Sequence, residues 1–152
     1  MRHLDTLRFV VISPELLLAL SPFAVYAYYP ALADVLVKPM KEGLVFGLVA
    51  AAIPLGMLAF NYKEGFDLLS PSGARKVLLE WPDYPMLKAR VFASFIWCVA
   101  GTAAGFVAVW MVAIDSLPRM AVVLLVAGIL AASASTATIA NSRFKARELL
   151  GE

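Results

Sequence analysis

Few residues could do chemistry inside the long apolar segments of this chain. Glu15 is the one ionisable side chain well within such a segment. A charged group in a bilayer core is costly, so a carboxylate there is a candidate proton-coupling group or cation ligand. The order Ser13, Pro14, Glu15 also fits an ordinary helix start, with Ser13 as the N-cap and an acid in the first turn. Both interpretations of Glu15 remain open from the sequence.

A second polar group lies in the last apolar segment, and its members do not share one helical face: Ser133, Ser135, Thr136, Thr138, Asn141 and Ser142. Hydroxyl groups in membrane helices usually bond a carbonyl of their own helix or a neighbouring helix. Alternatively, Ser133, Thr136 and Asn141 could join Glu15 in a hydrated cavity. Such an intramembrane polar site would be only weakly selective among ions.

The chain lacks the residue sets on which common catalytic and metal sites depend. The single histidine, His3, is close to the N-terminus, and the single cysteine, Cys98, lies in an apolar run that suits a packing residue. There is no Ser/His/Asp set, no glycine-rich phosphate loop and no pair of intramembrane carboxylates. We therefore predict no enzymatic activity, no cofactor and no bound metal.

Composition indicates that membrane helices position these side chains. Hydrophobic residues make up 62% of the 152 residues, whereas a soluble domain has roughly 45–50%. About 20 apolar residues cross a hydrocarbon core of roughly 30 Å. Four segments meet this requirement, at about residues 9–29, 43–60, 87–114 and 119–141. The predicted fold is a single-domain, all-α integral membrane protein, an up-down-up-down bundle of four transmembrane helices.

Proline and turn residues mark the ends of these segments. The first helix is expected to start at Ser13, with residues 1–12 along the membrane interface, and to end at Pro30. Residues 31–42 then form a short connection. The third helix is expected to start near Asp83, and residues 115–118 form a tight turn before the fourth helix.

The basic residues are distributed unevenly between the two sides of this predicted bundle. Ten of the 13 Lys and Arg residues fall in the N-terminal segment, the polar interval 61–90 and the basic tail 142–152. The other three fall in the two short connections. The positive-inside rule therefore predicts that both termini and the interval are cytoplasmic, in a cell inner membrane. A net charge of +2 is too small to indicate a nucleic-acid partner.

Small residues recur at helical spacing in three of the predicted helices, at Gly43 and Gly47, Gly101 and Gly105, and Gly128 and Ala132. Helices in lipid associate through close packing at such positions. These stripes could pack the helices of one protomer, or some could face outward and join protomers. We predict a homo-oligomer.

The polar interval contains an apolar stripe with the i, i+3, i+4, i+7 spacing of a short amphipathic helix, at Ala74, Val77, Leu78 and Trp81. Arg75 and Lys76 fall off this stripe. The helix could lie on the membrane among anionic headgroups, or it could bind a soluble protein. Aromatic residues dominate interface hot spots, so the expected anchors are Phe66, Trp81 and Tyr84.

The interval and the basic tail favour one function over two others. We predict a homo-oligomeric membrane assembly or docking subunit that binds a cytosolic protein and contacts the lipid bilayer. The alternative is an oligomeric ion-conducting pore or channel, toxin-like or a defence effector, which needs several protomers because one four-helix bundle has no obvious conduit. A third candidate is a small proton-coupled transporter that uses Glu15.

Overall fold

The computed structural model describes residues 13–70 and 80–150, and these residues form helices without any strand. Five helices follow one another along the chain: α2 (Pro14–Tyr28), α3 (Ala31–Glu42), α4 (Leu44–Leu69), α5 (Tyr84–Ala113) and α6 (Pro118–Leu150). The predicted all-helical class is therefore confirmed for the described part of the chain.

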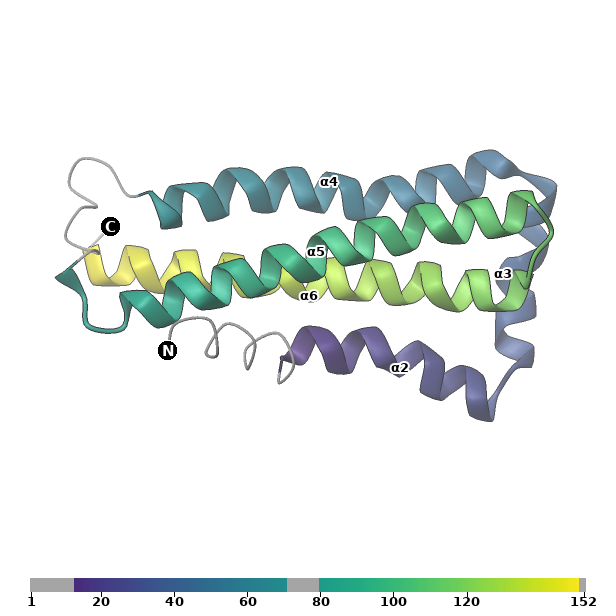
Figure 1. The fold of residues 1–152 in the computed structure, drawn as a ribbon, viewed down its shortest axis with the longest axis horizontal. Helices are drawn as coiled ribbons and strands as arrows, with labels where there is room; N and C mark the ends of the chain where they lie inside the picture. The colour runs from purple at the N-terminus through teal and green to yellow at the C-terminus, as the bar shows by residue number, and fades with distance from the viewer. Residues whose placement is uncertain (1–12, 71–79, 151–152) are drawn as a thin grey trace.

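The helices form an elongated bundle (Figure 1). α4, α5 and α6 run along its long axis, and α4 packs against both of the others. α2 packs mainly on α6, on the side away from α4. α3 lies across one end of the bundle and connects α2 to α4.

Helix length and composition identify a membrane protein. α4, α5 and α6 have 26, 30 and 33 residues, about 39, 45 and 50 Å at 1.5 Å per residue. Each is long and apolar enough to cross a membrane alone, whereas α2 and α3 meet the same test only as a pair bent by 107°. The structure therefore has three candidate spans, or four if the bent pair is one span.

The predicted connection at residues 31–42 is a helix in the structure. Pro30 ends α2 as expected, but it also precedes the first turn of α3. This segment contains no glycine, and it buries Ala33 and Met40, which are two helical turns apart. A helix with one apolar face is stable when that face packs on other helices, so the connection folds as α3.

Ion pairs connect α3 to the start of α6 and to the tight turn between α5 and α6. Arg119 Nε donates to Asp34 Oδ1 at 2.7 Å and its Nη2 donates to Oδ2 at 2.9 Å. Lys41 pairs with Asp115. The turn at residues 115–118 is present as predicted, and Asp115 and Leu117 both have left-handed backbone angles, with φ of 55° and 46°. These exposed pairs fix geometry more than they stabilise, since each contributes about 0.2–1 kcal/mol.

Small residues allow close contact between helices within the protomer. Gly101 and Gly128 face each other, so a Cβ on either would meet the other's carbonyl oxygen. Gly105 lies against Ala51 of α4 in the same way, with less crowding. Ala132 and Gly47 are also buried, whereas Gly43 is half-buried just before α4. That one of these stripes also joins protomers stays a prediction.

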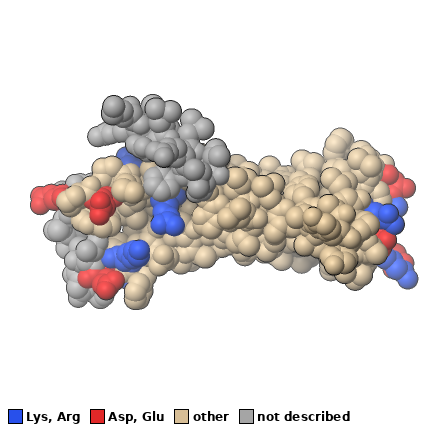
Figure 2. Space-filling model, turned by 90° about the horizontal axis from the view of Figure 1, so that it is seen from below, with Lys and Arg blue, Asp and Glu red and all other residues tan. Residues whose placement is uncertain are grey.

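The three long helices extend beyond the predicted spans at one end. α4 continues past residue 60 to Leu69, α5 begins at Tyr84, directly after Asp83, and α6 continues past residue 141 to Leu150. Residues 71–79, which hold most of the predicted amphipathic helix together with Arg75 and Lys76, lie outside the described residues. On the face shown in Figure 2, charged side chains gather at the two ends and leave a broad uncharged belt between them.

Replacing Gly128 with alanine should separate α5 from α6. The new methyl group would press on the backbone of Gly101, and overpacking of this kind typically costs about 1–3 kcal/mol. Gly56→Ala is the matched control, because a Cβ at Gly56 meets nothing within 4 Å. Unfolding of the detergent-solubilised protein measures both. Equal stability of the two variants would contradict the close contact.

Candidate functional site

Glu15 owes its position to the start of α2. The Ser13 hydroxyl oxygen accepts a hydrogen bond from the Leu16 backbone N–H at 3.2 Å, and Pro14 occupies the first helical position. This confirms the predicted helix start. Glu15 is therefore in the first turn, where the helix dipole favours a negative charge. Its side chain points into the bundle and is only 3% exposed.

Two hydroxyl groups from other helices hold the Glu15 carboxylate. Ser94 of α5 donates to Oε1 at 3.2 Å, and Thr138 of α6 donates to the same oxygen at 2.7 Å. The carboxylate thus links three helices at one point. Hydrogen bonds to charged groups are stronger than neutral ones, at about 1.5–3 kcal/mol each.

Glu15 lies near the edge of the uncharged belt rather than at its centre. Thr138 comes five residues before Arg143, and Ser94 comes four residues after Arg90. At 1.5 Å per residue, the carboxylate is about 6–8 Å inside these cations. The geometry fits a helix start close to the membrane boundary, and it also leaves an acid within the apolar part of the bundle.

The structure does not bring the other predicted polar residues to Glu15. Ser133 donates to the Ile129 carbonyl oxygen at 2.8 Å, and Thr136 donates to that of Ala132 at 2.9 Å. Both hydroxyls therefore bond a carbonyl of their own helix, Ser133 also contacts Met57 Sδ of α4 at 3.7 Å, and Asn141 is exposed. The described structure therefore does not group these three residues with Glu15, because the two hydroxyls bond carbonyls of their own helix and the Asn141 side chain is on the surface of the bundle.

A second buried polar contact lies close by. Asn61 of α4 is 0% exposed, and its side-chain amide donates to Cys98 Sγ of α5 at 3.3 Å. Its Oδ1 atom has no partner among the described residues. Cys98 is one helical turn from Ser94, so these contacts lie at neighbouring levels. We call this set the polar layer: Glu15, Asn61, Ser94, Cys98 and Thr138.

The bundle interior on the α3 side of the polar layer is apolar. Its buried cluster, within the described ranges, is built from alanine, valine, leucine and methionine side chains: Ala33, Met40, Ala51, Ala108, Val109, Val112, Ala121, Val122 and Leu125. Polar groups therefore reach into the bundle from one side only, as far as the level of Thr102. The described residues of the chain form no continuous polar route between the two ends of the bundle.

The helix ends beyond the polar layer form a separate packed unit, which we call the stalk: residues 62–69 of α4, 84–91 of α5 and 142–150 of α6. Leu68, Val91 and Ala146 are buried together there, one from each helix. Arg143 of α6 pairs with Glu64 of α4. The three helix ends are therefore held together by their own small hydrophobic core.

Tyr84 has a structural position in the stalk. Its hydroxyl donates to the carbonyl oxygens of Leu68 at 3.3 Å and Leu69 at 3.0 Å. These are end carbonyls of α4, which have no partner within their own helix. Tyr84 thus caps α4 from α5. Trp81, just before α5, is half-buried.

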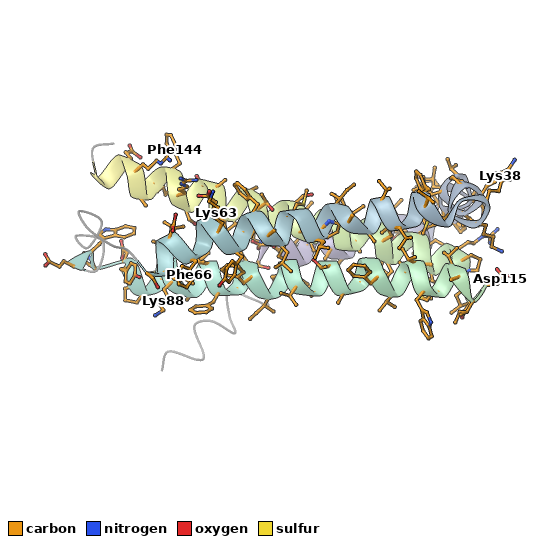
Figure 3. All side chains as sticks on the ribbon, turned by 90° about the horizontal axis from the view of Figure 1, so that it is seen from above. Lys38, Lys63, Phe66, Lys88, Asp115 and Phe144 are labelled. Carbon is orange, nitrogen blue, oxygen red and sulfur yellow. The ribbon has the colours of Figure 1, made fainter. Side chains whose placement is uncertain are left out.

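Other aromatic side chains of the stalk are exposed. Phe66 is 53% exposed and Phe144 is 69% exposed. Figure 3 shows both at the same end of the molecule as Lys63 and Lys88, opposite Lys38 and Asp115. Of the predicted docking residues, Phe66 is therefore the one with a free surface in the described structure. Phe144 was missed because it follows the last apolar segment within a basic tail.

Comparison with known proteins supplies no family for this chain. No protein-family model, curated protein or solved structure matches it.

Glu15→Ala should destabilise the bundle, because the hydroxyls of Ser94 and Thr138 lose their acceptor. A buried donor left without a partner costs about 1–3 kcal/mol. Glu15→Gln keeps an acceptor oxygen at the same place and should lose less. Unfolding in detergent measures both.

Thr136→Ala is the control for this comparison, because its hydroxyl bonds the Ala132 carbonyl oxygen of its own helix. We expect it to change stability by less than Glu15→Ala. A Glu15→Ala protein as stable as the wild type would show that the carboxylate does not hold α2 to α5 and α6.

Tyr84→Phe should loosen the end of α4 without changing the rest of the bundle. It removes one hydroxyl that caps two carbonyls, a change worth about 0.5–1.5 kcal/mol. Hydrogen exchange should become faster in the peptide that contains Leu68 and Leu69. Tyr62→Phe, at an exposed position on α4, should leave the exchange rate of this peptide unchanged. Similar exchange in the two variants would contradict the capping role.

Proposed function

We propose that this protein is a membrane-embedded, homo-oligomeric docking subunit whose stalk binds a soluble cytosolic protein. In this proposal the bent pair α2 and α3 completes a fourth span. Both termini and the stalk lie on the cytoplasmic side of an inner membrane. The observation that carries the proposal is the stalk itself, an ordered continuation of three helices with its own hydrophobic core.

The length of the stalk supports a role outside the bilayer. α6 continues seven residues beyond Arg143, and α4 continues eight residues beyond Asn61. At 1.5 Å per residue this adds about 10–12 Å to a belt that already matches a hydrocarbon core of roughly 30 Å. Helices that only needed to cross the membrane would end earlier.

The surface of the stalk supports protein binding. Its packing through Leu68, Val91 and Ala146, with the Tyr84 cap, fixes the relative positions of the three helix ends. A preorganised surface loses little conformational freedom when it binds. Phe66 and Phe144 are then exposed aromatic anchors among basic side chains. The matching partner has apolar pockets and an acidic rim.

The orientation is supported by the charges at the two ends. Among the residues that the structure describes, the α3 end carries three basic and three acidic residues, whereas six basic and five acidic residues lie on the stalk side of the belt. An excess of Lys and Arg favours the cytoplasmic side.

The two other candidate functions find less support in the geometry. A transporter that uses Glu15 needs polar groups beyond it, but the buried cluster toward α3 is apolar in the described residues. A pore would have to run between protomers rather than through one. The stalk surface is the feature that neither of these functions requires.

Photo-crosslinking in cells tests the docking proposal. A photoreactive amino acid placed at Phe66 or at Phe144 should yield an adduct with one soluble protein. The same group placed at Trp110, which is exposed on α5 within the uncharged belt, should yield lipid or self-adducts only.

Binding of the purified candidate to the protein in nanodiscs completes this test. Phe66→Ala with Phe144→Ala should weaken binding at least tenfold, about 1.4 kcal/mol, because both anchors are removed. Trp110→Ala should leave it unchanged. Adducts only with lipid and with other copies of this chain from both stalk positions would reject the docking role.

A further inference from the structure

The two ends of the protein differ in how their basic residues are paired. At the α3 end every Lys and Arg has a carboxylate partner: Lys38 with Glu42, Lys41 with Asp115, and Arg119 with Asp34. At the stalk end Arg143 pairs with Glu64. No described carboxylate lies within ion-pair distance of the five other described cations there, which are Lys63, Lys88, Arg90, Lys145 and Arg147.

Four of the five unpaired cations of the stalk end, all but Arg147, lie closer to the belt than the unpaired acid of the same helix or its start. On α4, Lys63 comes before Asp67 as the chain leaves the belt, and on α5, Arg90 and Lys88 lie closer to the belt than Asp83. On α6, Lys145 comes before Glu148. At 1.5 Å per residue the acids lie about 4–10 Å farther out. The level next to the apolar belt therefore presents unpaired positive charge on all three helices.

Lys88 also lies over an exposed aromatic ring at the edge of the apolar belt. Its Nζ is 6.0 Å from the centre of the Phe92 ring, one helical turn closer to the belt. Phe92 is exposed in the protomer. A lysine whose stem runs along an apolar surface while its ammonium group reaches the headgroup region is typical of a membrane interface.

We propose that Lys63, Lys88, Arg90 and Lys145, here named the basic layer, bind the phosphodiester headgroups of anionic phospholipids. Headgroups of this class carry the charge that the basic layer lacks, at the depth where the apolar belt ends. The inference does not require the docking role of the stalk, whose aromatic anchors Phe66 and Phe144 are different residues, although Lys63 and Lys145 lie near them in the sequence. This binding differs from general attraction by net charge because it is assigned to four named side chains.

Native mass spectrometry of the full chain in a neutral detergent tests the proposal. The protein is titrated with a phosphatidylglycerol and, separately, with a phosphatidylcholine of the same acyl chains. We expect the wild type to bind the phosphatidylglycerol more tightly. Lys88→Gln with Arg90→Gln should weaken that binding roughly 25-fold, since each basic residue near a membrane surface contributes about fivefold, and it should leave phosphatidylcholine binding unchanged.

Two control variants separate a defined site from general attraction and from misfolding. Lys38→Gln with Lys41→Gln removes the same number of charges from the α3 end, where carboxylates already pair with them, and should change phosphatidylglycerol binding less than twofold. Lys88→Arg with Arg90→Lys conserves both charges and should retain binding.

Three results would overturn the proposal. One is equal affinity of the wild type for the two lipids. Another is an equal loss in the stalk-end and α3-end double variants, which would indicate attraction by net charge alone. The third is tight binding of an acidic peptide such as oligoglutamate to Lys88 and Arg90 without preference for phosphatidylglycerol, which would assign these residues to a protein partner.

Discussion

The contact between Gly101 and Gly128 sets the distance between α5 and α6, and the remaining helices depend on that pair. The two backbones approach so closely that neither position has room for a Cβ. In lipid no hydrophobic force drives helices together. Association of α5 with α6 therefore depends on the van der Waals attraction between closely packed backbones. α4 then packs against both helices, and α2 packs mainly against α6. The hydroxyls that bond Glu15 come from α5 and α6. The distance between these two helices therefore also sets the positions of Ser94 and Thr138 in the polar layer.

Bilayer thickness is the second constraint, and the protein meets it differently at its two ends. At one end α3 lies across the bundle, and ion pairs join it to α6 and to the turn between α5 and α6. At the other end the helices continue beyond the uncharged belt, into the part of the bundle where charged side chains gather. A hydrophobic core, a tyrosine cap and a partly buried ion pair hold that continuation together. The helix ends are thus held by exposed ion pairs at the α3 end, and mainly by apolar packing and a tyrosine cap at the stalk end.

Much of the helical fold could be predicted from local signals, and much of the candidate site could not. Ser13 and Pro30 mark the ends of α2, and the turn at residues 115–118 is where the sequence places it. The helix α3 was missed because charged residues and Pro39 hide its apolar face. Thr138 and Asn61 were not assigned as site residues, because a hydroxyl or amide in a membrane helix has an equally good partner in its own backbone. Which groups bond across helices is decided by packing, which one sequence does not reveal.

The burial of Cys98 gives this protein a native chemical reporter. Its sulfur is 0% exposed and accepts a hydrogen bond from Asn61 across the contact between α4 and α5. Alkylating reagents need access to the thiolate, so the folded bundle should react slowly at this position. Because it is the single cysteine in the chain, its alkylation rate would follow transient separation of α4 from α5 without any introduced label. Local opening within the membrane could thus be timed in the unmodified protein.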